Sequence, residues 1–393
     1  MRKILVGLSL IFLILILIQP NSASAQTLKI AVSTSQTSNI NQMVKQLNYQ
    51  FDQIEPADLT NDEKLKDYQI LFINPDPQYD NFAGDSTSLA KFASNGGFIC
   101  ALGNSYNLLK SAFPEVITAT PNQEEGDKEI KILDKGLSNY LGNNQDKIGF
   151  KAGWIKIKNL AAKVNNYVEI AGDPAIVSFD SGEGGVLFSA ITPANQEEIA
   201  QNILKWLIFR SINYKTLIQN AKILRDDNLV PNDEIIASFE KQQTLKYTLE
   251  ALTSSDIKMA AAITSGEILI SVYSDNQKLD EVNLGVEDSP SIIELKPKSS
   301  WFPRTQAADK QQFRLEVTSQ SVDTNLAVIT LSNSVELTPL YVREKIQTEQ
   351  TASKPNFWQS LKPYLVFIAI GLIGFTGIII LAVLLSKPKQ NTF

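Results

Sequence analysis

Ile70-Leu71-Phe72-Ile73 and Phe98-Ile99-Cys100-Ala101-Leu102 are two apolar runs of strand length. Neither run alternates with polar residues, so each strand needs cover on both faces, as in a parallel sheet between two layers of helices. The segment between them has helical spacing at Leu89 and Phe92 and stops at Asn95-Gly96-Gly97, where glycine can take the left-handed conformation. This order predicts a parallel α/β unit.

The alternation of strands and helices continues upstream of this unit. We expect a strand at 28–33, followed by a helix whose apolar face holds Ile40, Met43, Val44 and Leu47. The expected chain order is therefore strand, helix, strand, helix, strand.

Downstream, two apolar runs at 175–179 and 186–191 flank a glycine-rich segment at 180–185. The glycines favour a hairpin turn. Asp180 and Glu183 in this turn could touch a cation, but a solvated turn is the preferred interpretation because glycine clusters serve tight bends.

A capping box at 195–198 opens a helix that would close this part of the chain. We therefore expect residues 26–213 to form a doubly wound, mostly parallel α/β domain. Residues 214–245 have the composition of a helical connector, with a helix expected from Pro231-Asn232 to just before Thr244.

From 246 to 345 the apolar period changes to two, for example at Ile268, Ile270 and Val272. Short strands separated by Ser, Asn, Asp and Pro predict an antiparallel β-sandwich. Residues 346–363 are largely polar and read as a juxtamembrane stalk.

The first 25 residues have the pattern of a signal peptide. Arg2 and Lys3 precede the apolar run Ile4–Ile18, and Ala23-Ser24-Ala25 ends the segment. The alternative is a retained anchor, but a membrane span needs about 20 apolar residues.

Tyr364–Leu385 is uncharged and long enough to cross a bilayer. Lys387 and Lys389 follow it, which favours a cytoplasmic tail at 386–393. We therefore expect a single-pass type I protein of the cell membrane, held in the bilayer by Tyr364–Leu385, with its ectodomain outside the cytoplasm.

Composition excludes several kinds of chemistry. The chain has no histidine, which removes the commonest metal ligand and the usual general base at neutral pH. We therefore expect neither a metal nor a cofactor. One cysteine excludes an intramolecular disulfide, and a net charge of −6 argues against a nucleic-acid partner.

In an open α/β sheet, ligands bind beyond the carboxyl ends of the strands. Polar residues follow three of the expected strands at that edge. The candidate ligand-binding residues are Ser33, Thr34, Ser35, Asn74, Asp76, Asn104 and Ser105. The hydroxyl-rich loop at 33–39 resembles the phosphate loop of flavodoxins but lacks its glycine, so helix capping is the favoured role.

The element order over about residues 28–212 resembles the class I glutamine amidotransferase-like superfamily, whose active members have a Gly-x-Cys-x-Gly elbow after the third strand. Laid on that pattern, the elbow position falls on Gly103, so the nucleophile is missing. Cys100 lies within the strand, where a thiol packs as a hydrophobe. Without histidine, the Cys-His-Glu relay of this superfamily cannot be built.

Ser105 could replace the nucleophile only with a nearby base, and Lys110 is the nearest lysine. Nothing in their spacing brings the two groups within hydrogen-bond reach, so we expect Ser105 to cap the following helix instead. No catalytic residue is expected.

A domain of this kind without its nucleophile, joined to a sandwich and one membrane helix, resembles a non-catalytic branch of the superfamily. That branch includes auxiliary subunits of gliding-motility transporters and the noncatalytic membrane subunit of oligosaccharyltransferase. The resemblance implies a non-enzymatic binding or scaffolding role, with a protein or glycan partner, beside a membrane complex.

The rival hypothesis is a carbohydrate-active hydrolase, because glycoside hydrolysis needs only paired carboxylates. Its candidate residues are Asp76, Asp80, Asp180 and Glu183. Two of these carboxyl groups would have to face a common cleft about 5 to 10 Å apart.

Overall fold

The structure is a computed structural model, and it describes residues 28–34, 39–80, 82, 84–120, 127–141, 147–151, 156–158, 164–191, 198–239, 243–252, 256–274, 276–295, 310–321 and 326–345. The expected signal peptide, stalk, membrane segment and tail, together with Ser35, lie outside these residues. Within the described residues, no helix has both the length and the apolar character that a membrane span requires.

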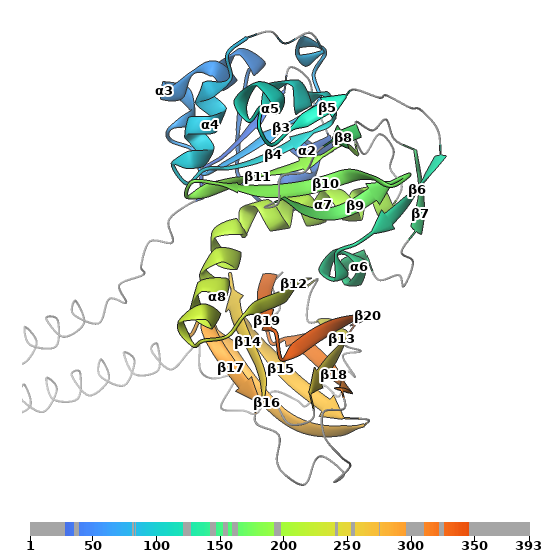
Figure 1. Ribbon diagram of the computed structural model, residues 1–393. Coiled ribbons are helices and arrows are strands. Elements are labelled where there is room, and N and C mark those ends of the chain that lie inside the picture. The colour runs from blue at the N-terminus through green and yellow to red at the C-terminus, as the bar shows by residue number, and fades with distance from the viewer. Residues whose placement is uncertain are drawn as a thin grey trace, which may run out of the picture. The chain divides into compact units, whose positions relative to one another are not determined.

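A nine-stranded mixed sheet forms the first half of the chain (Figure 1). In sheet order its strands are β2 (Asp52–Ile54), β1 (Ile30–Ser33), β3 (Ile70–Ile73), β4 (Phe98–Leu102), β11 (Gly184–Ser189), β10 (Asp173–Ser181), β9 (Asn165–Ile170), β6 (Asp127–Ile132) and β7 (Lys147–Lys151). The pairings from β2 to β11 are parallel, whereas those from β11 to β7 are antiparallel.

The expectation of a mostly parallel sheet is therefore wrong for this second part. The physical reason is the length of the connections. A parallel crossover needs a dozen or more residues, and only a few residues separate β9, β10 and β11. The predicted hairpin at 180–185 is confirmed, because Ser181 pairs with Gly184 across the turn.

Helices cover both faces of the parallel strands, as predicted. They are α2 (Asn39–Gln46), α3 (Asp62–Leu65), α4 (Thr87–Ser94), α5 (Tyr106–Ala112) and α7 (Glu198–Ile212), with 3-10 turns η1 (Pro56–Thr60), η2 (Pro77–Tyr79) and η3 (Gly103–Ser105). In Figure 1, α3, α4 and α5 lie on one side of the sheet and α7 lies on the other. Every residue of β1, β3 and β4 is buried.

Cys100 lies in β4 with no exposed surface, which confirms its predicted place in the core. Burial raises the pKa of its thiol to about 12, and a hydrogen bond with Ser211 only partly offsets this effect. The thiol is therefore protonated at neutral pH and is not a nucleophile.

The chain from α7 onward differs from the expected connector. A helix is present, α8 (Tyr214–Asp226), but it precedes Pro231. The predicted helix after Pro231 is wrong, because Pro231–Ser238 forms strand β12 and pairs with β19. Helical spacing of the buried residues Leu217, Asn220 and Leu224 accounts for α8.

The predicted antiparallel sandwich is present as two sheets. One contains β12, β19 (Leu326–Ser332), β14 (Ile257–Ile263) and β17 (Ser291–Leu295); the other contains β16 (Gln277–Gly285), β15 (Glu267–Ser274), β18 (Lys310–Ser319), β13 (Gln243–Leu252) and β20 (Val335–Lys345). Ile268, Ile270 and Val272 are buried, as their alternation predicts. The short helix α6 (Lys135–Leu141) and the pair β5 (Thr118–Thr120) and β8 (Lys156–Lys158) complete the described elements.

The β10–β11 hairpin packs with almost no space against the end of α4. The backbone N–H of Glu183 donates to the Ser94 carbonyl at 3.1 Å. A Cβ added to Gly184 would lie 2.0 Å from the Gly97 carbonyl oxygen and 2.4 Å from that of Ala93. Glycine at 184 is thus required by the close approach of two backbones.

We predict that Gly184→Ala destabilises the protein by about 1–3 kcal/mol, the usual cost of overpacking. Gly285→Ala is the matched control, since its added Cβ would meet only the Asp288 carboxylate at 3.4 Å. Denaturant unfolding of both variants measures the difference. Equal stability of the two would show that the hairpin can move away from α4.

Candidate functional site

The carboxyl ends of β1, β3 and β4 bring the predicted site residues together. The Asp76 backbone N–H donates to Asn104 Oδ1 at 3.0 Å. Asn104 Nδ2 donates to the Asp76 carbonyl at 2.9 Å and to Asp80 Oδ1 at 2.6 Å. Asn74 Nδ2 lies 3.5 Å from the Ser33 carbonyl oxygen. The loops after the three strands are therefore joined by side-chain amides.

Gly103 occupies the elbow between β4 and η3 with φ of +56°. A nucleophile elbow holds its reactive side chain on a sharp, strained turn. Glycine adopts the left-handed backbone without strain and presents no side chain. Gly103 therefore offers no reactive group at this turn.

Tyr79 is buried beside the turn at Gly103, between the loop after β1 and helix α5. Its ring is buried, its hydroxyl lies 3.1 Å from Ser33 Oγ, and its carbonyl accepts from Asn107 Nδ2 at 2.6 Å. Burial is the main cause that raises its pKa to about 12. Tyr79 therefore stays a neutral phenol and is not a general base at neutral pH.

Burial also separates most predicted site residues from solvent. Those with 0 to 3% of their surface exposed are Ser33, Thr34, Asn74, Asp76 and Ser105. Asn104 is partly exposed. Among the described residues of this edge, the polar side chains thus connect the loops to one another.

Ser105 occupies the N-cap position of α5, as predicted, but its side chain makes no capping hydrogen bond. Its backbone is already helical, with φ of −62° and ψ of −8°, whereas a capping residue is extended. Its hydroxyl instead donates to the Leu102 carbonyl at 2.8 Å. Lys110 lies on α5 with its side chain exposed, one turn beyond Tyr106, the first residue of that helix.

The four candidate carboxylates divide between two edges of the sheet. Asp76 Oδ1 accepts from the Gln78 N–H at 3.0 Å and begins η2, and Asp80 binds Asn104. Asp180 Oδ1 accepts from the Tyr214 hydroxyl at 2.9 Å in the hairpin that also carries Glu183.

That hairpin lies beside the first residue of β4, because Gly185 pairs with Phe98. The loop of Asp76 and Asp80 lies beyond the opposite ends of the strands. A strand of this length separates its ends by roughly 13 Å at about 3.3 Å per residue. The two pairs of carboxylates therefore do not face a common cleft.

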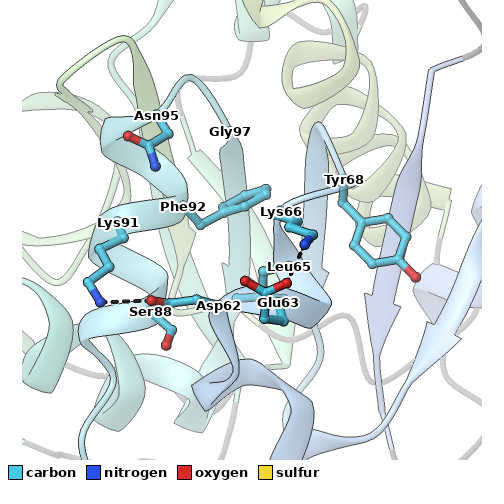
Figure 2. A pocket seen from close by; sticks show the side chains of 10 residues that line it. All are labelled: Asp62, Glu63, Leu65, Lys66, Tyr68, Ser88, Lys91, Phe92, Asn95 and Gly97. Carbon is cyan, nitrogen blue, oxygen red and sulfur yellow. Dashed lines mark hydrogen bonds and ion pairs between the residues drawn. The ribbon is translucent and has the colours of Figure 1, made fainter.

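A small cavity lies between α3 and α4, at the amino ends of β3 and β4 (Figure 2). Its volume is about 200 Å³, below the range of ordinary ligand pockets, which begins near 300 Å³. Leu65, Phe92 and Gly97 provide its apolar lining, and the rest of the lining is polar. The sequence did not predict this cavity. In an open α/β sheet, ligands are expected beyond the carboxyl ends of the strands, whereas this cavity lies at their amino ends.

Two exposed ion pairs flank this cavity. Lys91 Nζ lies 2.7 Å from Asp62 Oδ2, and Lys66 pairs with Glu63 one turn along α3. The hydrogen bond from Lys91 lowers the pKa of Asp62, and Glu63 raises the pKa of Lys66. Each charge is balanced by its neighbour, so the cavity offers a ligand little net charge.

No protein-family model matches the chain, and no curated protein matches it. Among solved structures, it is similar to a protein described as a component of GMP synthase from Thermoplasma acidophilum, at 12% identity and a TM-score of 0.38 over 49% of this chain and 98% of the other. A ThuA-like protein from Bacteroides uniformis gives 14% identity and a TM-score of 0.37, over 49% and 94%.

PurLQS from Thermotoga maritima gives 13% identity and a TM-score of 0.34, over 48% of this chain and 99% of the other. All three structures share little sequence with this chain. At such identities and TM-scores they assign the chain to no family and to no activity.

We predict that Asn104→Ala destabilises the protein by about 2 kcal/mol, since each lost hydrogen bond contributes about 1 kcal/mol or leaves a partner unsatisfied. Asn95→Ala, at the cavity between α3 and α4, is the control and should change stability by less than about 0.5 kcal/mol. Chemical denaturation followed by circular dichroism measures both. An unchanged Asn104→Ala variant would mean that this network does not hold the loops.

Proposed function

We propose that this protein is a non-enzymatic, membrane-anchored binding or scaffolding protein that acts outside the cytoplasm as an accessory subunit of a membrane complex. The observation that carries the proposal is Gly103. It takes the left-handed turn of a catalytic elbow, at φ of +56°, and has no side chain with which to react. A fold that keeps the turn and omits the nucleophile serves binding better than catalysis.

The partner in this proposal is a protein or a glycan. The net charge of −6 disfavours nucleic acid, and Tyr364–Leu385 would hold the chain in the bilayer. The resemblance to transporter auxiliary subunits and to the noncatalytic oligosaccharyltransferase subunit supports the same role. No cofactor or metal enters the proposal.

The hydrolase hypothesis has weaker support. Asp76 caps η2, Asp80 binds Asn104 and Asp180 binds Tyr214, so each of these carboxylates has a structural partner. A glycosidase needs two carboxyl groups on either side of one glycosidic bond. Asp180 and Glu183 lie at the opposite ends of the strands from Asp76 and Asp80, so the two pairs do not share one cleft.

The topology predicts that protease added to intact cells or spheroplasts degrades the ectodomain and leaves a small membrane fragment. The tail at 386–393 should be protected until the membrane is opened. Tags at 26 and at 393, detected separately, make the measurement. Complete protection of the tag at 26 would contradict the proposed orientation.

For the activity itself, the full-length chain in mild detergent should release no ammonia from glutamine and hydrolyse no generic ester or glycoside. After gentle solubilisation of the native membrane and chemical cross-linking, it should migrate within a larger membrane assembly. Turnover that disappears in Asp76→Asn or Ser105→Ala, from a chain that migrates alone, would refute the binding role.

A further inference from the structure

A partly buried charged cluster joins α6, α7, β9 and β12. Its centre is Arg210 of α7, whose Nη1 pairs with the Glu234 carboxylate of β12. Arg210 Nη2 donates to the Tyr167 hydroxyl of β9 at 2.7 Å. The guanidinium also lies over the rings of Tyr167 and Trp206, 4.7 and 5.5 Å from their centroids. These contacts fix the cation in one place.

Asp134 adds a second carboxylate to the cluster, and Arg210 attracts it electrostatically. Its Oδ1 accepts from the Leu137 N–H at 2.6 Å, at the start of α6. Burial raises the pKa of Asp134 to about 6, and the attraction of Arg210 offsets only part of that effect. Glu234 thus forms the ion pair with the guanidinium, and Asp134 is attracted to the same cation from the start of α6.

Helix α6 is pressed directly onto the backbone of β12. A Cβ added to Gly136 would lie 2.5 Å from the Glu234 carbonyl oxygen. Lys135 Nζ lies 3.8 Å from Asp233 Oδ2 at the rim of the same contact. Any change of charge at Asp134 therefore acts where α6 meets β12.

The groups that face Asp134 do not balance its charge. They are Arg210 from α7, Glu234 and Asp233 from β12, Tyr167 from β9 and Lys135 from α6 itself. Tyr167 stays neutral because burial raises its pKa. With every acid ionised, three carboxylates face two cations. One proton would cancel the surplus.

We propose that Asp134 takes up one proton in mildly acidic conditions and that this uptake tightens the contact between α6 and β12. The protonated carboxyl still accepts from the Leu137 N–H through its carbonyl oxygen, so α6 keeps its first hydrogen bond. Glu234 then has Arg210 to itself. We call this contact between α6 and β12 the latch: it joins two elements that are distant in the sequence, and one proton on Asp134 strengthens it.

The direction of the pH dependence follows from the raised pKa. Below the ordinary value of 3.8, Asp134 is neutral in both the folded and the unfolded chain. Between that value and about 6 only the folded chain holds the proton, so stability falls as the pH rises through this window and is lowest above it. Acidification from pH 7 to pH 5 should therefore strengthen the latch.

The test is hydrogen exchange of the full-length chain in detergent, at pH 5 and pH 7, corrected for intrinsic exchange rates. In the wild type, protection of the α6 and β12 amides should rise on acidification from pH 7 to pH 5 by up to about 10-fold, less where Asp134 keeps contact with water. In Asp134→Asn the protection should be high at both pH values. The exposed residue Asp226 supplies the control Asp226→Asn, which should behave as the wild type.

Glu234→Gln is the second variant, because it removes the other carboxylate on Arg210. Asp134 should then have the cation to itself, and the midpoint of the pH dependence should fall by roughly one unit. A wild-type pH dependence that persists in Asp134→Asn, a midpoint that Glu234→Gln leaves unmoved, or an Asp134→Asn chain unfolded at both pH values would each overturn the latch.

Discussion

The structure depends on one constraint, which is that β1, β3 and β4 have no face in contact with water. Strands of this kind must lie between two layers of helices, and the loops that connect strands to helices therefore gather at the two ends of the strands. The turn at Gly103, the buried ring of Tyr79 and the hydrogen bonds of Asn104 all lie at the carboxyl ends of these strands. Their geometry is a consequence of the buried sheet.

At this edge, hydrogen bonds join the loops that follow the strands. Asn104 binds the backbone of Asp76 and the carboxylate of Asp80, and Ser105 binds the strand that precedes it. Polar groups that are paired with one another in a buried position cannot be paired with a ligand without the loss of those bonds. A ligand at this edge would therefore have to contact the outer surface of the loops or break these bonds.

The apolar runs predicted the central strands well, because full burial leaves a clear pattern in the residues. Phe98–Leu102 was predicted without error, and the proximity of Asn74, Asp76 and Asn104 followed from the rule on strand ends. The edge strand β2 was missed, since Ile54 is its only buried residue. After Pro231, the sequence pattern predicted a helix where β12 forms. The apolar run Ile235-Ile236-Ala237 is buried, but a short apolar run does not distinguish a buried strand from a helix. The cavity beside Phe92 depends on how α3 and α4 pack, which no local pattern encodes.

The contact of α6 with β12 also affects whether two copies of the protein can pair through their β-sheets. β12 is the outermost strand of its four-stranded sheet, and an outermost strand offers unpaired backbone groups to any passing chain. Gly136 lies so close to the Glu234 carbonyl that no second strand fits beside it there. The helix thus shields this part of the edge strand from pairing with the sheet of another copy.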